Sequence, residues 1–398
     1  MFLFYTILYL LLLYMGPTFE AFSPLLMIPV ALLREGYLLF IFLYLLVSIG
    51  RKKSLKFSCE NNLLEICILL AFPYIIMTNN IPKAVPTFLA FYSGPFLFCC
   101  ITNLSFSDKT RKKFHYFVFF LLTLICFMSI CLYFIQEKIV PLFPKEVFNH
   151  FYLTKHEGMG RLRLFGIGFH PTTTGFLIMY YIGLLFFGEK KYFLSLIYLP
   201  FWYFTNTRSS VFGIMAYIFY KQRKLLKILI ICIAIITFGI ILKLYVSAKL
   251  HNYLDPSALV HIMHLFLTGP QNMLAYVTGT GLGSVSPYNT DNPIIHLESD
   301  LYLYSIQVNI INLVLFVIAL LFIIKKLIKG NTSQTNFLLF IMLTFFMGCI
   351  IFPLHSLRFT SNFVWMELAF YFCRSKGDTD VFSINHNVQW FKVHNQSN

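Results

Sequence analysis

Four polar stretches interrupt an otherwise apolar chain, and residues 161–175 are the densest of them in groups that can do chemistry. This stretch reads RLRLFGIGFHPTTTG and holds Arg161, Arg163 and His170 beside three threonines and three glycines. A guanidinium binds phosphate oxygens through paired hydrogen bonds and stays charged in proteins. Arg161 and Arg163 are therefore candidate anion-binding residues, with ordinary loop charges as the alternative. His170 precedes Pro171 at an expected helix start, where a structural role and a substrate contact are equally open.

Arg208 is the most informative single residue, because it lies between two apolar segments with almost no loop around it. Placing arginine in hydrocarbon costs about 2.5–3.5 kcal/mol on insertion scales. A position at the membrane interface lowers that cost, and an anionic partner lowers it further, whereas the alternative is a side chain that reaches out to water. Three arginines at one face would suit a di-anionic group such as a pyrophosphate.

The remaining polar stretches contribute candidate proton carriers. His296, Glu298 and Asp300 alternate just before an apolar segment, where the carboxylates suit the first turn of a helix. His296, or Glu298 as its rival, could instead take a proton from an attacking hydroxyl. His261 and Arg358 are further possible substrate contacts, although His261 also fits an interfacial helix that faces water. The histidines show no metal-ligand spacing, so we expect no metal and no cofactor.

The elements that must position these residues are membrane helices. The chain has 398 residues, of which 58% are hydrophobic and only 12% charged, and its mean hydropathy is +0.73. Soluble domains are about 25% charged, and a core cannot absorb this much apolar surface. The net charge of +15 could suggest nucleic acid. Most Lys and Arg residues instead gather in short segments between apolar runs, which is the positive-inside pattern of a membrane protein.

The sequence predicts an all-α, polytopic membrane bundle of about 12–13 transmembrane segments with two large outer-face loops. Residues 1–373 form one integral membrane domain, with outer loops at 136–171 and 247–298, and residues 374–398 form a polar cytoplasmic tail. The nine cysteines lie within or beside apolar runs and are interpreted as packing residues. The expected segments are 2–15, 20–33, 36–50, 62–79, 84–104, 114–135, 172–188, 192–205, 208–220, 225–246, 299–324, 335–352 and 360–373, of which the first two are either a hairpin or one broken segment.

The order of the polar motifs resembles the O-antigen polymerase and ligase superfamily, the Wzy-type polysaccharide polymerases. The resemblance covers roughly residues 110–325. Thr207 and Asn309 depart from the pattern, because the family usually has serine before the arginine and often has glycine at the second position. The matching motifs are Arg163-Leu-Phe-Gly166 followed by His170-Pro-Thr-Thr-Thr-Gly175, then Thr205-Asn-Thr-Arg208-Ser209, then Gly279, Gly281 and Gly283, and finally His296 to Asp300.

This resemblance implies a metal-independent glycosyltransferase at the outer face of the bacterial cytoplasmic membrane. It would transfer a growing glycan from undecaprenyl pyrophosphate to a lipid-linked repeat unit. Arg161, Arg163 and Arg208 would stabilise the pyrophosphate leaving group, and His296 or Glu298 would act as base. The implied partners are the lipid-linked oligosaccharide, the bilayer, and a flippase and a chain-length regulator of the same pathway, with no nucleic acid.

Three alternatives remain open. A ligase would pass the same glycan to another acceptor by nearly the same chemistry. A flippase or transporter of lipid-linked oligosaccharide would carry its charged residues near the bilayer midplane, with access from both sides. A membrane scaffold without enzymatic activity would have no need for an arginine at position 208.

The substitution Arg208→Ala tests the arginine-based interpretation. We expect it to abolish glycan chain elongation while the protein still inserts and accumulates, because an anionic leaving group loses its stabilising charge. Polymer length and amount, measured on gels of extracted glycan beside an immunoblot of membranes, check the outcome. Unchanged polymer would contradict the proposed role.

Overall fold

The computed structural model describes the helical frame of the molecule. Its described residues are 2–15, 30–52, 58–77, 81–142, 162–166, 168, 170–205, 207, 214–215, 217–218, 220, 277–282, 304, 306–330, 332–351 and 358–375. Within these ranges the chain is all-α, apart from one two-stranded parallel sheet. Arg161, Arg208, His261, His296 and Glu298 lie outside the described residues.

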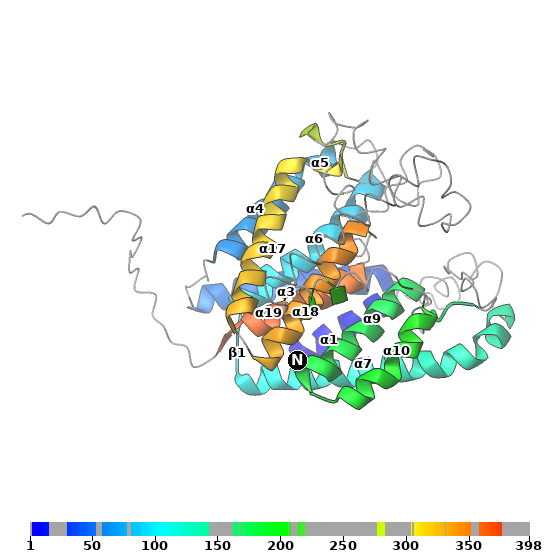
Figure 1. The fold of residues 1–398 in the computed structure, drawn as a ribbon. Helices are drawn as coiled ribbons and strands as arrows, with labels where there is room; N and C mark the ends of the chain where they lie inside the picture. The colour runs from blue at the N-terminus through cyan, green and yellow to red at the C-terminus, as the bar shows by residue number, and fades with distance from the viewer. Residues whose placement is uncertain are drawn as a thin grey trace, which may run out of the picture.

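The described helices follow the apolar segments of the sequence (Figure 1). Five stretches are long and apolar enough to cross a membrane: Cys59–Ile76, Ile81–Asn103, Lys109–Ile139, Pro171–Gly188 and Ile310–Gly330. The chain is therefore that of an all-α membrane protein. The elements are α1 (Phe2–Tyr14), α3 (Val30–Lys52), α4 (Cys59–Ala71), α5 (Pro73–Ile76), α6 (Ile81–Asn103), β1 (Ser105–Phe106), α7 (Asp108–Ile139), η1 (Val140–Leu142), α9 (Pro171–Gly183), the π-helical turn η2 (Leu184–Gly188), α10 (Tyr192–Phe204), α17 (Ile310–Gly330), α18 (Ser333–Ile351), α19 (Arg358–Phe372) and β2 (Arg374–Ser375).

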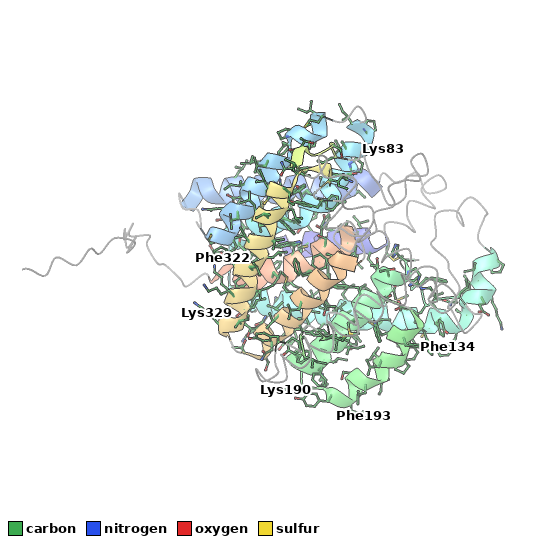
Figure 2. All side chains as sticks on the ribbon, turned by 45° about the horizontal axis from the view of Figure 1, so that its top comes forward. Lys83, Phe134, Lys190, Phe193, Phe322 and Lys329 are labelled. Atoms are coloured by element: carbon green, nitrogen blue, oxygen red, sulfur yellow. The ribbon has the colours of Figure 1, made fainter. Side chains whose placement is uncertain are left out.

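Contacts between helix ends sort the described helices into alternating directions. The start of α7 meets the end of η2, where His115 Nε2 lies 3.7 Å from Glu189 Oε1. The end of α17 meets the start of α4 through an ion pair between Lys326 and Glu60. Strand β1, just before α7, pairs in parallel with β2, just after α19. We call this side of the bundle the basic end, and Figure 2 places Lys190 and Lys329 toward it and Lys83 and Phe134 away from it.

The helices diverge from the basic end. In Figure 1 the end of α17 and the start of α7 lie close to β1, and the two helices separate from there toward different edges of the molecule. The opposite end therefore carries the end of α7, the starts of α9 and α17, and the end of α10. The polar motifs of the sequence that the structure describes all lie at these opposite helix ends.

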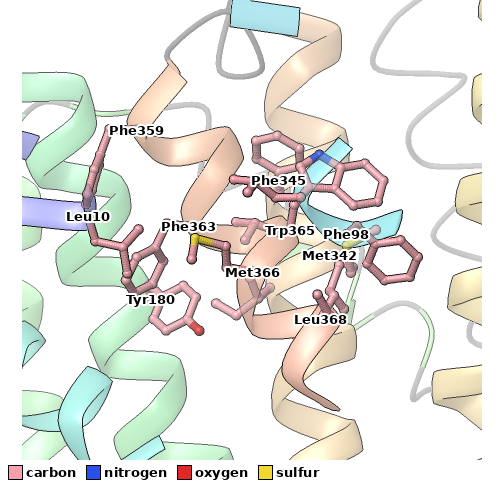
Figure 3. Packing of buried hydrophobic residues seen from close by; sticks show 14 of the residues in the cluster. Leu10, Phe98, Tyr180, Met342, Phe345, Phe359, Phe363, Trp365, Met366 and Leu368 are labelled. Atoms are coloured by element: carbon pink, nitrogen blue, oxygen red, sulfur yellow. The ribbon is translucent and has the colours of Figure 1, made fainter. Parts of the chain in front are cut away.

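Helices α6 and α19 pack closely in the centre of the bundle. Gly94 of α6 lies directly under the indole ring of Trp365, leaving no room for a side chain. Beside this contact, Ser93 Oγ donates to Asn362 Oδ1 (2.8 Å), and Asn362 Nδ2 donates to Tyr9 Oη of α1 (2.8 Å). Figure 3 shows Trp365, Phe363 and Met366 of α19 packed among Phe98, Phe345 and Tyr180 from three other helices. Small residues and interhelical hydrogen bonds are what hold helices together in lipid.

The structure corrects three of the expected boundaries. The prediction of one continuous span over 299–324 is wrong. The backbone leaves the helical conformation at Asn309, and α17 begins at Ile310. Residues 30–33, assigned to a separate short run, belong to α3. The tail predicted from residue 374 begins with strand β2, whose pairing with β1 supplies hydrogen bonds that a free tail would lack. Residues 376–398 lie outside the described ranges.

The contact at Gly94 can be tested with Gly94→Ala, using Gly36→Ala in α3 as control. A methyl group at position 94 meets the Trp365 ring, whereas one at position 36 meets nothing within 4 Å. We expect Gly94→Ala to lower the free energy of unfolding by about 1–3 kcal/mol, as overpacked cores do. Gly36→Ala should leave it unchanged or raise it by up to about 1 kcal/mol, because alanine favours a helix more than glycine does. Thermal unfolding of detergent-purified protein measures both. Equal unfolding temperatures for the two variants would contradict the packing described here.

Candidate functional site

The described residues of the first two motifs, around Arg163 and Thr205, meet where α7 ends, α9 begins and α10 ends. Leu164 N donates to the carbonyl of Phe204 (2.9 Å). The neighbouring Arg163 Nε donates to the carbonyl of Thr205 (2.7 Å). The segment before α9 is therefore tied to the last turn of α10, 42 positions further along the chain. We call this region, formed by residues 162–175 and 204–207, the Arg163 junction.

Two hydroxyls and a glycine bring the second motif against the first. Thr205 Oγ1 donates to Thr207 Oγ1 (3.0 Å), and Thr207 Oγ1 in turn donates to the carbonyl of Pro171 (3.5 Å). Gly175 lies against both threonine hydroxyls, so closely that a Cβ atom there would collide with them. The glycine thus allows the first turns of α9 to approach Thr205 and Thr207 closely.

Helix α7 supplies two buried polar residues that the sequence analysis missed. Gln136 Nε2 donates to the carbonyls of Leu162 (2.9 Å) and Arg163 (3.3 Å). These two hydrogen bonds tie the segment before α9 to α7. Ser129 lies beside Gly166, whose φ of 65° is in the left-handed region that glycine adopts without strain. Ser129 and Gln136 are seven residues apart, so they share one helix face within an apolar run, and that spacing was the available signal.

A tight turn sets the position of His170. Thr174 Oγ1 donates to the carbonyl of Phe165 (2.7 Å), and the backbone N–H of His170 donates to the same carbonyl (3.1 Å). His170 is the N-cap of α9, with Nδ1 accepting from the backbone N–H of Thr173 (3.3 Å). Because Nδ1 is the acceptor, the proton of the neutral imidazole sits on Nε2.

Electrostatics hold His170 in that neutral form. Burial, followed by the positive charge of Arg163, lowers the pKa of His170 from 6.5 to about 4. A positive helix N-terminus also opposes a cation at this position. At neutral pH the residue therefore offers an Nε2–H donor rather than a proton acceptor. This geometry makes His170 a helix cap through Nδ1 and leaves Nε2–H as a hydrogen-bond donor, which is compatible with both the structural role and the substrate contact considered from the sequence.

The described part of the glycine-rich motif lies at the starts of α5 and α17 and forms a second polar cluster. Gly279 and Gly281 have φ values of 75° and 94°, which a side chain would strain. Their segment is held by Leu282 N, which donates to the carbonyl of Tyr74 (2.9 Å), and by Gly281 N, which donates to the carbonyl of Gln307 (3.0 Å). The glycines thus allow their backbone to lie close to α5 and to the turn before α17.

Asn309 holds the other side of this cluster. Its φ of 151° is a conformation that glycine reaches freely, and glycine is what the resembled family often has at this position. The asparagine offsets the strain with its side chain, because Oδ1 accepts from Asn312 N (2.7 Å) and Nδ2 donates to Tyr74 Oη (2.6 Å). These two hydrogen bonds hold Asn309 in this backbone conformation.

Of the remaining expected site residues, Arg358 is the first residue of α19. Among the described residues, no group of three His, Cys, Asp or Glu side chains could hold a metal ion. Together, the junction and the α-helical frame define an all-α membrane protein with a polar region at one set of helix ends. In comparisons with known proteins, no family model, no curated protein and no solved structure matches this chain.

The neutral state of His170 predicts a pH-dependent stability. The pKa of His170 is about 4 in the folded state and about 6.5 in the unfolded chain, so the unfolded state binds more protons between these values. Stability is therefore full above about pH 6.5, falls as pH decreases through this window and levels off below about pH 4. Asparagine also caps helices but does not titrate there, so His170→Asn should weaken this dependence.

Thermal unfolding of detergent-purified protein at pH 7.5 and pH 5 measures the effect. The matched control is His115→Asn, at the basic end of α7. We expect the drop in unfolding temperature between the two pH values to shrink in His170→Asn by more than in His115→Asn. The same drop in His170→Asn as in the wild type would contradict the neutral assignment.

Proposed function

We propose that this protein is a polysaccharide polymerase of the outer face of the bacterial cytoplasmic membrane. It transfers a growing glycan from undecaprenyl pyrophosphate to a lipid-linked repeat unit, without metal or cofactor. The observation that carries the proposal is the Arg163 junction, because the two arginine-bearing motifs of the Wzy-type pattern meet there through direct hydrogen bonds.

The junction suits a pyrophosphate leaving group. The Nε bond to the Thr205 carbonyl orients the guanidinium of Arg163, whose half-buried position strengthens its field on a nearby anion. Thr207, which the junction holds, immediately precedes Arg208 in the sequence. Arginines held beside a departing pyrophosphate stabilise the charge that develops as the glycosidic bond breaks. Arg161 is the third arginine assigned to this role.

His170 is assigned to the same step as a donor. Its Nε2–H is complementary to an anionic oxygen or to a sugar hydroxyl oxygen, and its low pKa makes it a poor base at neutral pH. The base that accepts the proton of the attacking hydroxyl is therefore assigned to His296, with Glu298 as its rival. His261 and Arg358 remain candidate contacts of the glycan.

Two other activities compete with this proposal. A ligase would use the same leaving group and the same arginines, and would differ only in its acceptor. A flippase would need its polar residues near the bilayer midplane, whereas Arg163, His170 and Thr207 lie at helix ends. The helix-end position favours a transferase over a transporter. The cellular partners proposed for it are the flippase and the chain-length regulator of the same pathway.

The lipid-linked glycans of a deletion strain distinguish these activities. Accumulated single repeat units support a polymerase, long lipid-linked chains point to a ligase, and repeat units trapped in the inner leaflet point to a flippase. Complementation with Arg163→Ala should then lower the rate of elongation by about 100-fold, as expected when one donor to a developing anion is removed.

Two further variants control this experiment. Arg163→Lys keeps the charge but loses the planar paired donors, so we expect an intermediate rate. Lys138→Ala removes an exposed cation from the last turn of α7, at the same end of the bundle, and should leave elongation unchanged. Wild-type polymer from Arg163→Ala, in membranes that contain the variant at normal levels, would overturn the assignment.

A further inference from the structure

A cavity of about 570 Å³ lies at the basic end of the bundle, away from the Arg163 junction. It is lined by the start of α7, the end of η2, the start of α18 and the end of α19. This volume falls within the range of small-molecule sites. None of the residues assigned to the proposed transfer reaction lines it. The proposed reaction therefore does not explain which ligand the cavity would bind.

A buried carboxyl group lines this cavity. Glu367 of α19 is only 5% exposed, and within the described residues its Oε1 atom has no hydrogen-bond partner. The hydroxyl of Tyr180, which faces the same carboxyl, also has no partner there. A buried carboxyl without a partner costs several kcal/mol unless a donor or a cation reaches it. The lining therefore calls for a ligand that carries N–H donors.

The walls next to Glu367 favour a cation over a neutral donor. Phe337, Phe370 and Tyr371 line the same cavity. Aromatic faces attract ammonium groups through their quadrupoles, and a carboxylate among aromatic rings is a typical amine site. Glu367 and Tyr371 are four residues apart in α19, so they share one face of the helix.

The rim of the cavity favours an anion. Arg111 and Lys112 of α7 line it, together with Ser333 and Gln334 from the first turn of α18. The positive end of a helix dipole adds to these two cations, and such a combination favours an anion, phosphate above all. Two further polar side chains of the lining, His115 and Glu189, lie beside each other, with 3.7 Å between Nε2 and Oε1.

We propose that this cavity binds a zwitterion with a primary ammonium group at Glu367 and a phosphate group at Arg111 and Lys112. The source is the headgroup of an aminophospholipid, because the cavity is lined by the ends of helices in a protein with five membrane-length helices. Soluble phosphoethanolamine carries the same two groups. The binding would join α7, α18 and α19 at their ends.

Binding of defined lipids to the purified full-length protein tests the proposal. Delipidated protein in detergent receives equal amounts of phosphatidylethanolamine, phosphatidylcholine and phosphatidylglycerol with identical acyl chains, and native mass spectrometry counts the adducts. A primary ammonium donates hydrogen bonds that choline cannot donate. We expect about tenfold more phosphatidylethanolamine than phosphatidylcholine adduct, the ratio that corresponds to one hydrogen bond to a charged group.

Variants assign this preference to the cavity. Glu367→Gln should reduce phosphatidylethanolamine binding to the level of phosphatidylcholine, and Lys112→Ala should weaken the binding of both lipids. Lys109→Ala is the control, because Lys109 is exposed on the first turn of α7 and does not line the cavity. Size-exclusion profiles show which variants fold. Lys112 is exposed, so its variant remains informative if Glu367→Gln does not fold.

Soluble phosphoethanolamine distinguishes the two sources. Its competition with the lipid shows that the headgroup alone is sufficient, and a failure to compete shows that the acyl chains contribute; both results agree with a zwitterion site. Binding of phosphatidylcholine or phosphatidylglycerol equal to that of phosphatidylethanolamine would overturn the proposal. So would an unchanged lipid preference in a folded Glu367→Gln variant, or unchanged binding in Lys112→Ala.

Discussion

Contact between α6 and α19 is the interaction on which the arrangement of the other helices depends. In lipid, helices gain little by burying apolar surface against one another, so association rests on close packing and on polar bonds. Gly94 provides the close approach to Trp365, and the hydrogen bonds from Ser93 through Asn362 to Tyr9 extend it to a third helix. Helix α1 is thereby held in the bundle, and its last residue, Tyr14, packs against Gly168 beside the Arg163 junction.

The charged side chains at the two ends of the bundle are arranged differently. At the Arg163 junction, a cation lies beside a histidine that is kept neutral, so the local field is positive and donors predominate. At the basic end, cations at the rim of a cavity face a buried carboxyl group. The first arrangement suits the anionic leaving group proposed for the junction, and the second suits the zwitterion proposed for the cavity. Under these two proposals, a single helical frame holds two sites for different ligands.

Much of the helical frame was predictable, since long apolar runs with basic breaks leave few alternatives to membrane helices. The polar motif around Arg163 and His170 was visible for the same reason, because polar residues stand out in such a chain. The break at Asn309 was not predictable from hydropathy, since the apolar pattern continues through it and the cause is a φ value of 151° stabilised by Tyr74 from a distant helix. Gln136 was missed because its role depends on two backbone carbonyls that only the fold brings within reach.

The pairing of β1 with β2 has a consequence for counting membrane crossings. Two strands can exchange hydrogen bonds only on the same side of a bilayer, so Ser105 and Arg374 share a compartment. The chain between them must then traverse the membrane an even number of times. This parity rule excludes any topology with an odd number of crossings between β1 and β2, whatever hydropathy suggests for a single ambiguous segment. A two-residue sheet thus constrains the membrane topology of the chain between Phe106 and Arg374.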